Sequence, residues 1–105
     1  MDSVLKELED VLEQRKAAKA DESYVASLYA KGEDEILKKI AEEAAEVIMA
    51  TKDDINDKII YKVADLWFHT LVLLRLKGIE VDAITNELSR RFGLSGLEEK
   101  ANRNN

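Results

Sequence analysis

The stretch "VADLWFHTLVLLRL" (residues 63–76) contains only four polar side chains, those of Asp65, His69, Thr70 and Arg75. At 100° per residue, its apolar side chains fall on nearly every side of a helix. A helix of this kind lies at the centre of a bundle or is shared across an interface. A chain of 105 residues offers it few neighbours, so we expect a two-fold homodimer that completes the bundle, rather than a monomer with an exposed apolar patch.

Apolar residues recur at helical spacing through most of the remaining chain. The expected N-terminal elements are a helix over about 4–19 capped by Ser3, a short helical turn over 23–32 closed by a left-handed Gly32, and a helix from about 33 to 51. The expected later elements are a helix capped by Asp54 and ended by Gly78, a helix over about 81–92, and a short terminal helix with the capping-box pair Ser95 and Glu98. This pattern predicts an all-α fold, a bundle of four main helices.

The composition fits a single helical domain spanning residues 1–105. Proline is absent and there are only four glycines, which leaves long helices uninterrupted. Apolar residues make up 46% of the chain and charged residues 36%, enough for both a core and a solvated surface. The absence of cysteine excludes a disulfide framework, a thiol nucleophile and a thiolate metal site.

Charge and hydropathy restrict the partners. A net charge of −6 argues against nucleic-acid binding, which needs a basic surface. The N-terminus lacks the apolar run of a signal peptide, and the apolar segment 66–74 is too short to cross a membrane core of about 30 Å. We therefore expect a cytoplasmic protein with no membrane or nucleic-acid partner. A nucleotide substrate stays open, because a divalent cation can bridge carboxylates to phosphates.

The segment "AEEAAE" (residues 41–46) crowds three carboxylates onto a helix that faces the core. Glu43 falls at the edge of the apolar stripe, Glu46 projects beside it, and Glu42 lies further toward solvent. The ordinary explanation is a set of surface ion pairs, since Lys38 and Lys39 precede Glu42 and Glu43 by four residues.

The next helix carries a matching polar strip of Lys62, Asp65 and His69. In an antiparallel hairpin about residues 51–56, residues whose numbers sum to about 108 lie opposite each other, so Glu43 faces Asp65 and Glu46 faces Lys62. Buried carboxylates are costly unless they are paired or bind a cation. Convergence of the acidic side chains predicts an oxygen-ligated site for Mg²⁺ or Mn²⁺.

Other candidate residues have simpler explanations. We expect His69 to be a hydrogen-bonded structural residue, and we expect the aromatic residues Tyr24, Tyr29, Trp67 and Phe68 to lie in the core or an interface. The basic residues Arg90, Arg91, Lys100 and Arg103 are either a solvated patch or anchors for substrate phosphates, and their spacing does not decide between the two.

Several motifs together resemble one family. The chain carries "SYVASLYAKG", "ILKKIAEEAAEVI", "ADLWFHTLVLL" and "RRFGLSGLEEKA" in that order. Within them, "EEAAE" followed by Asp65 is similar to the paired acidic metal signature of the all-α (MazG-like) NTP pyrophosphatases. From about Val4 to Arg103, the sequence resembles the phosphoribosyl-ATP pyrophosphohydrolase family of histidine biosynthesis.

This resemblance implies a Mg²⁺-dependent homodimer that cleaves phosphoribosyl-ATP between the α and β phosphates. The products would be pyrophosphate and phosphoribosyl-AMP, and a pathway cyclohydrolase would act as a separate protein. The implied metal ligands are Glu43, Glu46 and Asp65, with Glu42 supporting the site or orienting water. The candidate contacts for substrate phosphates are Lys38, Lys39, Lys52, Arg90 and Arg91.

Lys62 departs from the family pattern, which has glutamate at this position. An ammonium cannot ligate Mg²⁺ and competes with it for carboxylates. Either the site is weakened or lost, or another acid such as Asp57 or Glu42 substitutes, or Lys62 turns away to solvent. We expect a metal affinity and a rate below the family norm. The alternatives are a related NTP pyrophosphatase and a non-catalytic dimer whose acidic cluster is salt-bridged.

Overall fold

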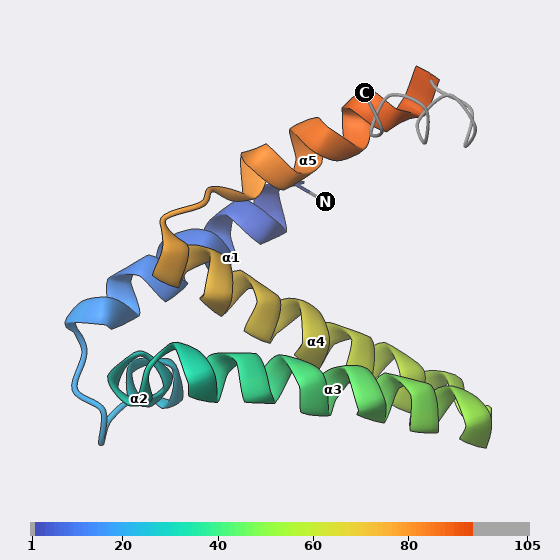
Figure 1. Ribbon diagram of the computed structural model, residues 1–105, viewed down its shortest axis with the longest axis horizontal. Coiled ribbons are helices and arrows are strands. Elements are labelled where there is room, and N and C mark those ends of the chain that lie inside the picture. The colour runs from blue at the N-terminus through green and yellow to red at the C-terminus, as the bar shows by residue number, and fades with distance from the viewer. Residues whose placement is uncertain (1, 94–105) are drawn as a thin grey trace.

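The computed structural model describes the backbone of residues 2–93 and the side chains of residues 4–92. Figure 1 shows a wholly helical architecture, and no strand occurs within residues 2–93, so the all-α prediction is confirmed. The α-helices are α1 (Asp2–Gln14), α2 (Tyr24–Lys31), α3 (Glu33–Asp53), α4 (Asn56–Lys77) and α5 (Val81–Arg90). Two 3₁₀ segments follow α1 and α5, namely η1 (Arg15–Ala17) and η2 (Arg91–Gly93).

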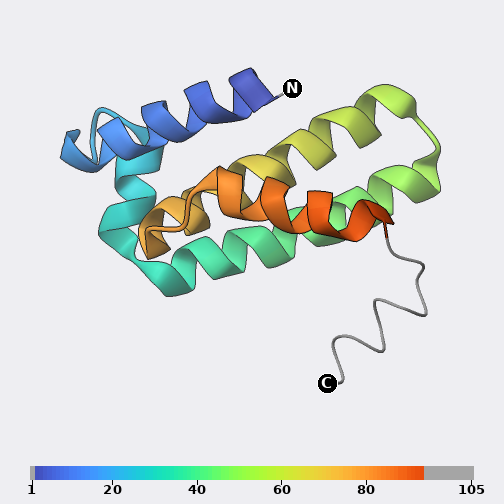
Figure 2. The same ribbon diagram turned by 90° about the horizontal axis from the view of Figure 1, so that it is seen from above.

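The long helices α3 and α4 form an antiparallel hairpin, joined only by Asp54 and Ile55 (Figures 1 and 2). The prediction that Asp54 caps α4 is wrong. Asp54 adopts the left-handed conformation, with φ 57°, and its N–H donates to the carbonyls of Ala50 and Thr51 at 3.2 and 3.0 Å. Aspartate tolerates this conformation better than most residues, so a two-residue connection becomes possible and Ile55 takes the N-cap position.

The glycine predictions are confirmed in part. Gly78 ends α4 in the left-handed conformation, with φ 70°, as expected. Gly32 also has a positive φ, 98°, but its ψ of −176° is extended rather than left-handed helical. The reason is that Gly32 both ends α2 and precedes α3, and this sharp change of direction uses a region of φ and ψ that is open mainly to glycine.

Two predicted ends differ from the structure. Ser3 lies within α1 rather than at its N-cap, and α1 continues as 3₁₀ helix η1 instead of remaining α-helical to residue 19. The helix expected over 81–92 is α-helical only to Arg90. The terminal helix predicted from Ser95 and Glu98 lies outside the described residues.

The core lies where α1 and α2 pack on one end of the α3–α4 hairpin (Figure 2). Its fully buried side chains come one from each of these four helices: Leu12, Leu28, Ile36 and Val72. None of the described helices combines the length and the apolar character needed to cross a membrane.

A buried carboxylate connects α1 to α4 and α5. Glu9 is only 6% exposed, accepts a hydrogen bond of 2.8 Å from the N–H of Val81, and lies 3.2 Å from the guanidinium of Arg75. Because a buried charge is stable only when paired and hydrogen-bonded, these contacts fix where α5 starts. From there α5 diverges from α4 (Figure 1).

Candidate functional site

The acidic cluster, which we define as Glu43 and Glu46 on α3 together with Asp65 on α4, lies midway along the hairpin. The Lys62 Nζ lies 3.3 Å from Glu46 Oε2, which confirms the predicted pairing of these positions. The charge of Asp65 acts on Glu43, where it raises the pKa of the carboxyl. The sequence register therefore placed the two helices correctly against each other.

Glu43 has one carboxylate oxygen that is shielded from solvent. Its Oε2 atom is buried and accepts no hydrogen bond from any residue that the structure describes. Burial raises the pKa of the Glu43 carboxyl above its usual value, and Glu46 and Asp65 beside it raise it further. An acceptor without a partner in this position costs stability, and it is available to bind a cation or a proton.

Lys62 fills the space that the family pattern gives to a fourth carboxylate. Its ammonium lies 3.3 Å from Glu46 and 4.0 Å from Asp65 Oδ2. The hydrogen bond to Glu46 raises the pKa of Lys62 above its usual value, while Glu43 and Lys62 together lower the pKa of Glu46. In this structure Lys62 is thus an ion-pair partner of the cluster and is not turned away to solvent.

Glu42 lies at the outer edge of the site. It is exposed, and its carboxylate oxygens lie 3.9 Å from the ammonium groups of Lys38 and Lys39 on the same helix. This is the ordinary arrangement of surface ion pairs that the sequence suggested as an alternative. Lys52, in the last turn of α3, is exposed.

Arg90 and Arg91 are not brought to the acidic cluster. Both lie at the C-terminal end of α5, which is well separated from α3 in Figure 1. Glu87 accepts hydrogen bonds from Arg90, the shortest 2.8 Å, and lies 3.9 Å from Arg91. Within one chain, these two arginines therefore form a local ion-pair group. Lys100 and Arg103 lie outside the described residues.

A hydrogen-bonded chain of Tyr24, His69 and Asp65 connects α2 to the site. The Tyr24 hydroxyl lies 2.8 Å from His69 Nε2, and His69 Nδ1 lies 2.8 Å from the backbone carbonyl of Asp65. A carbonyl only accepts, so Nδ1 carries the hydrogen and Nε2 accepts from Tyr24. His69 is 6% exposed, and its expected structural role is confirmed.

Tyr24 is a residue whose position the sequence did not reveal. It is 52% exposed, so it is not a core residue of this chain. Burial nevertheless raises the pKa of the Tyr24 hydroxyl. The positive charge of Lys39 lowers this pKa, whereas the negative charges of Glu43 and Asp65 raise it. The only signal in the sequence was its place directly after Ser23, which accepts a hydrogen bond from Ala26 N and caps α2.

The donor set of the cluster has the chemistry that Mg²⁺ prefers, because all three side chains offer carboxylate oxygens, and Glu43 Oε2 is an acceptor without a partner. Their present arrangement is not a closed site. Among the described residues, no three carboxylate, imidazole or thiol side chains are placed so that they could hold a metal ion together. The residues fit the ion in kind, and binding requires Lys62 to withdraw and the carboxylates to turn toward one another.

Comparison with known proteins gives a consistent result. The family model described as phosphoribosyl-ATP pyrophosphohydrolase matches residues 5–92. A phosphoribosyl-ATP pyrophosphatase of Vesicomyosocius okutanii is 78% identical over 105 residues, and one of Ruthia magnifica is 77% identical, each match spanning the whole of both chains. A phosphoribosyl-ATP pyrophosphatase of Methylococcus capsulatus is 59% identical over 95% of each chain.

Proposed function

Because the chain belongs to the phosphoribosyl-ATP pyrophosphohydrolase family, we propose that it hydrolyses phosphoribosyl-ATP in the second step of histidine biosynthesis. Water adds to a phosphorus atom of the anhydride between the α and β phosphates, and the bridging P–O bond breaks. The products are phosphoribosyl-AMP and pyrophosphate. The observation that carries this proposal is the family match over nearly the whole described chain.

The acidic cluster is the proposed centre of the reaction. Glu43, Glu46 and Asp65 would hold Mg²⁺, or Mn²⁺ in its place, and the partnerless Glu43 oxygen supports this assignment. When bound, the ion neutralises phosphate charge and polarises the phosphoryl oxygens. Lys62 competes with it for Glu46 and Asp65, so we propose a metal affinity below that of a site with four carboxylates.

The exposed edge of α3 supplies the remaining proposed roles. Glu42 lies next to the cluster in the sequence and reaches solvent, and we propose that its carboxylate orients the attacking water and accepts its proton. Lys38, Lys39 and Lys52 would contact the β and γ phosphates as point charges. Arg90 and Arg91 could join them only from a second copy of the chain, because their own α5 carries them away from α3 (Figure 1).

Pyrophosphate release from phosphoribosyl-ATP at millimolar Mg²⁺ tests the proposal, with dATP and dUTP as comparison substrates. Glu43→Gln should reduce turnover by about 100-fold or more if the carboxylate holds the ion. Asp34→Asn is the matched control, because Asp34 is an exposed acid in the first turn of the same helix. Preference for dATP or dUTP would favour a related NTP pyrophosphatase. Activity on none of the three would favour the non-catalytic dimer, for which the Lys62 ion pairs are the supporting observation.

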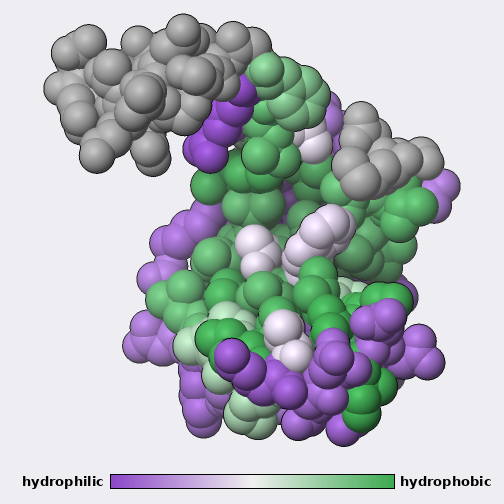
Figure 3. Space-filling model, turned by 90° about the vertical axis from the view of Figure 1, so that its right-hand side faces the viewer, coloured by the Kyte–Doolittle hydropathy of each residue, from purple (hydrophilic) through white to green (hydrophobic). Residues whose placement is uncertain are grey.

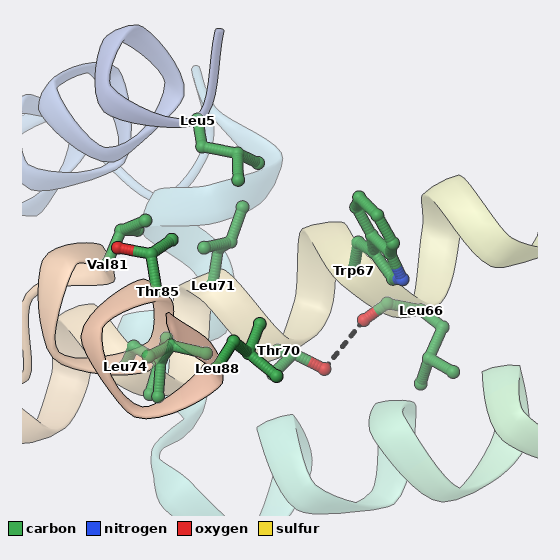
Figure 4. Close-up of a pocket in the computed structure, with 10 residues that line it drawn as sticks. Leu5, Leu66, Trp67, Thr70, Leu71, Leu74, Val81, Thr85 and Leu88 are labelled. Atoms are coloured by element: carbon green, nitrogen blue, oxygen red, sulfur yellow. Dashed lines mark hydrogen bonds between the residues drawn. The ribbon is translucent and has the colours of Figure 1, made fainter. Parts of the chain in front are cut away.

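We propose a homodimer in which a second copy covers an apolar groove. The groove encloses about 450 Å³ between α1, α4 and α5, and its lining includes Leu66 and Trp67 of α4 with Ile84 and Leu88 of α5 (Figure 4). The Thr70 hydroxyl in this lining donates a hydrogen bond of 2.8 Å to the backbone carbonyl of Leu66 (Figure 4), so its hydrogen is already used within the chain. A surface of this kind offers contact area but little hydrogen bonding, as the centre of a subunit interface does.

The shape of the chain supports the same proposal. Its radius of gyration is 16.1 Å, whereas a compact domain of this length has about 13 Å. Figure 3 looks into the side where α5 diverges from α4 and shows hydrophobic residues gathered over a broad hollow area. Trp67 and Leu88, which line the apolar groove, are 52% and 50% exposed. A second copy would bury this area and complete the bundle around α4.

Mass measurement by light scattering tests the dimer. We expect twice the chain mass of 11.9 kDa at micromolar concentration, and dissociation to one chain on Leu88→Glu, which puts a charge into the groove. Leu37→Glu, at a 43% exposed leucine of α3 outside the groove, should leave the mass unchanged. A wild-type monomer, or a dimer that tolerates Leu88→Glu, would contradict the proposed interface.

We place the reaction in the cytoplasm, where a separate cyclohydrolase would use the product. Phosphoribosyl-AMP still carries a closed purine ring, which is the kind of substrate on which a cyclohydrolase acts by adding water. Cell fractionation with antibodies against the chain tests the compartment.

A further inference from the structure

A second cavity lies beside the acidic cluster. It encloses about 530 Å³ between η1, the start of α2 and α4, and its walls include Arg15, Glu22, Ser23, Tyr24 and Phe68. We call it the polar cavity. It differs from the apolar groove in carrying a carboxylate and a guanidinium, those of Glu22 and Arg15, and nothing in the reaction at the acidic cluster uses them.

Tyr24 connects the polar cavity to the acidic cluster. The phenol ring belongs to the cavity wall, while its hydroxyl donates to His69 Nε2, and His69 in turn bonds to the Asp65 carbonyl. Phe68, in the same wall, directly precedes His69 on α4 and meets the imidazole edge-on, with ring centres 5.5 Å apart. The two sites are therefore connected through these bonded side chains of α2 and α4.

The polar groups of the cavity are free to bind a ligand. Arg15 is exposed and makes no ion pair with any residue that the structure describes. Ser23 Oγ accepts the α2 capping hydrogen bond at 3.2 Å, which leaves its own hydrogen to donate. Glu22 is exposed and belongs to the same wall.

This set of groups suits a sugar phosphate. A guanidinium binds phosphate through paired hydrogen bonds, and a carboxylate accepts from the neighbouring hydroxyls of a ribose, as it does in nucleotide-binding folds. Aromatic rings cover the apolar faces of a sugar or a base. Glu22 would repel a whole triphosphate, so a single phosphate on a ribose fits better than the polyphosphate chain.

We propose that the polar cavity binds the phosphoribosyl group of the substrate, with Arg15 on its phosphate and Glu22 on its ribose hydroxyls. The inference rests on the proposed function, since that substrate carries a ribose phosphate at one end and a triphosphate at the other. The triphosphate then lies at the acidic cluster, and Tyr24 separates the two ends. The polar cavity thereby distinguishes phosphoribosyl-ATP from ATP.

Product binding tests this without metal or turnover. Calorimetric titration of the full chain with phosphoribosyl-AMP and with AMP should show affinity at least about tenfold higher for phosphoribosyl-AMP, the effect of a charge-assisted phosphate contact. Arg15→Ala should remove that preference and leave AMP binding unchanged, while Arg15→Lys should restore part of it. Lys19→Ala is the matched control, because Lys19 is an exposed cation nearby that does not line the cavity.

Equal affinity for the two nucleotides, or a preference that survives Arg15→Ala, would overturn the inference. Turnover separates this from failure of the proposed function. If wild type releases pyrophosphate from phosphoribosyl-ATP and Arg15→Ala leaves KM unchanged, the function stands and the cavity assignment fails. If wild type releases none yet prefers phosphoribosyl-AMP through Arg15, the cavity assignment stands and the function fails.

Discussion

Replacing Lys62 with glutamate turns the acidic cluster into a site with four carboxylates and so tests what Lys62 does to metal binding. The wild-type group of Glu43, Glu46, Asp65 and Lys62 has a formal net charge of minus two, and Lys62→Glu makes it minus four. The change removes the ammonium that lies 3.3 Å from Glu46 and 4.0 Å from Asp65, and it adds an oxygen ligand at the same place.

Two effects of opposite sign follow. Without metal, four neighbouring carboxylates repel one another, so the midpoint of thermal unfolding should fall below that of the wild type. With Mg²⁺, the added ligand and the loss of the competing cation should raise the affinity by about 10- to 100-fold. At a concentration 100 times the dissociation constant, binding should then raise the midpoint by about 10 °C.

Calorimetric titration with Mg²⁺ and Mn²⁺ measures the affinity, and thermal melts in EDTA and in Mg²⁺ measure the two stabilities. Lys62→Gln is the control, since it removes the cation without adding a ligand and should gain less than Lys62→Glu. An unchanged Mg²⁺ affinity in Lys62→Glu would refute the reasoning, because it would mean that position 62 does not face the ion. An equal increase in Mg²⁺ affinity in Lys62→Glu and Lys62→Gln would show that the side chain at position 62 does not ligate the ion.

Three further predictions concern stability. Because burial raises the pKa of Glu43, the folded state without metal loses stability as pH rises from the usual glutamate pKa through the raised pKa of the folded state. Glu43→Gln should therefore be more stable than wild type at pH 7 in urea titrations with EDTA. The difference should vanish below pH of about 4, where the carboxyl is protonated in both states. Tyr24→Phe leaves the buried His69 Nε2 without its donor and should cost about 1 to 2 kcal/mol in urea unfolding; an unchanged midpoint would mean that water replaces the hydroxyl. Val72→Ala, at a fully buried valine, should cost about 2 kcal/mol, whereas Val4→Ala at a 64% exposed valine should cost less than about 0.5 kcal/mol; similar costs at the two sites would contradict the placement of the core.

The helices and the register of the hairpin were predictable from the sequence. Helical periodicity is local, and a short connection between two long helices forces them to run antiparallel. The sequence therefore predicts that Glu46 pairs with Lys62, and the structure confirms this contact. The residues at which the helices begin and end were less predictable. Asp54 can cap a following helix or end a preceding one, and only the two-residue length of the connection selected the second role.

The candidate site was predictable only where it lies on one hairpin. The acidic cluster follows from α3 and α4 alone, and its residues were identified correctly as neighbours. The direction of the Lys62 side chain was not predictable, because an ammonium can turn to solvent or to carboxylates at similar cost until its neighbours are fixed. Contacts from other helices were missed altogether, and Tyr24 with its bond to His69 is the clearest example.

The sequence by itself determined the helical class, the family, the apolar character of α4 and the crowding of acids on α3, because these depend on residue type and on spacing along one helix. The tertiary structure decided the placement of α2 and α5, the bond between Tyr24 and His69, the ion pairs of Lys62, and the separation of Arg90 from the acidic cluster. The physical reason is that helix periodicity constrains only neighbours within a few turns. The packing of one helix on another depends instead on the loops, the buried Glu9–Arg75 pair and the shape of the core, all of which act across distant parts of the chain.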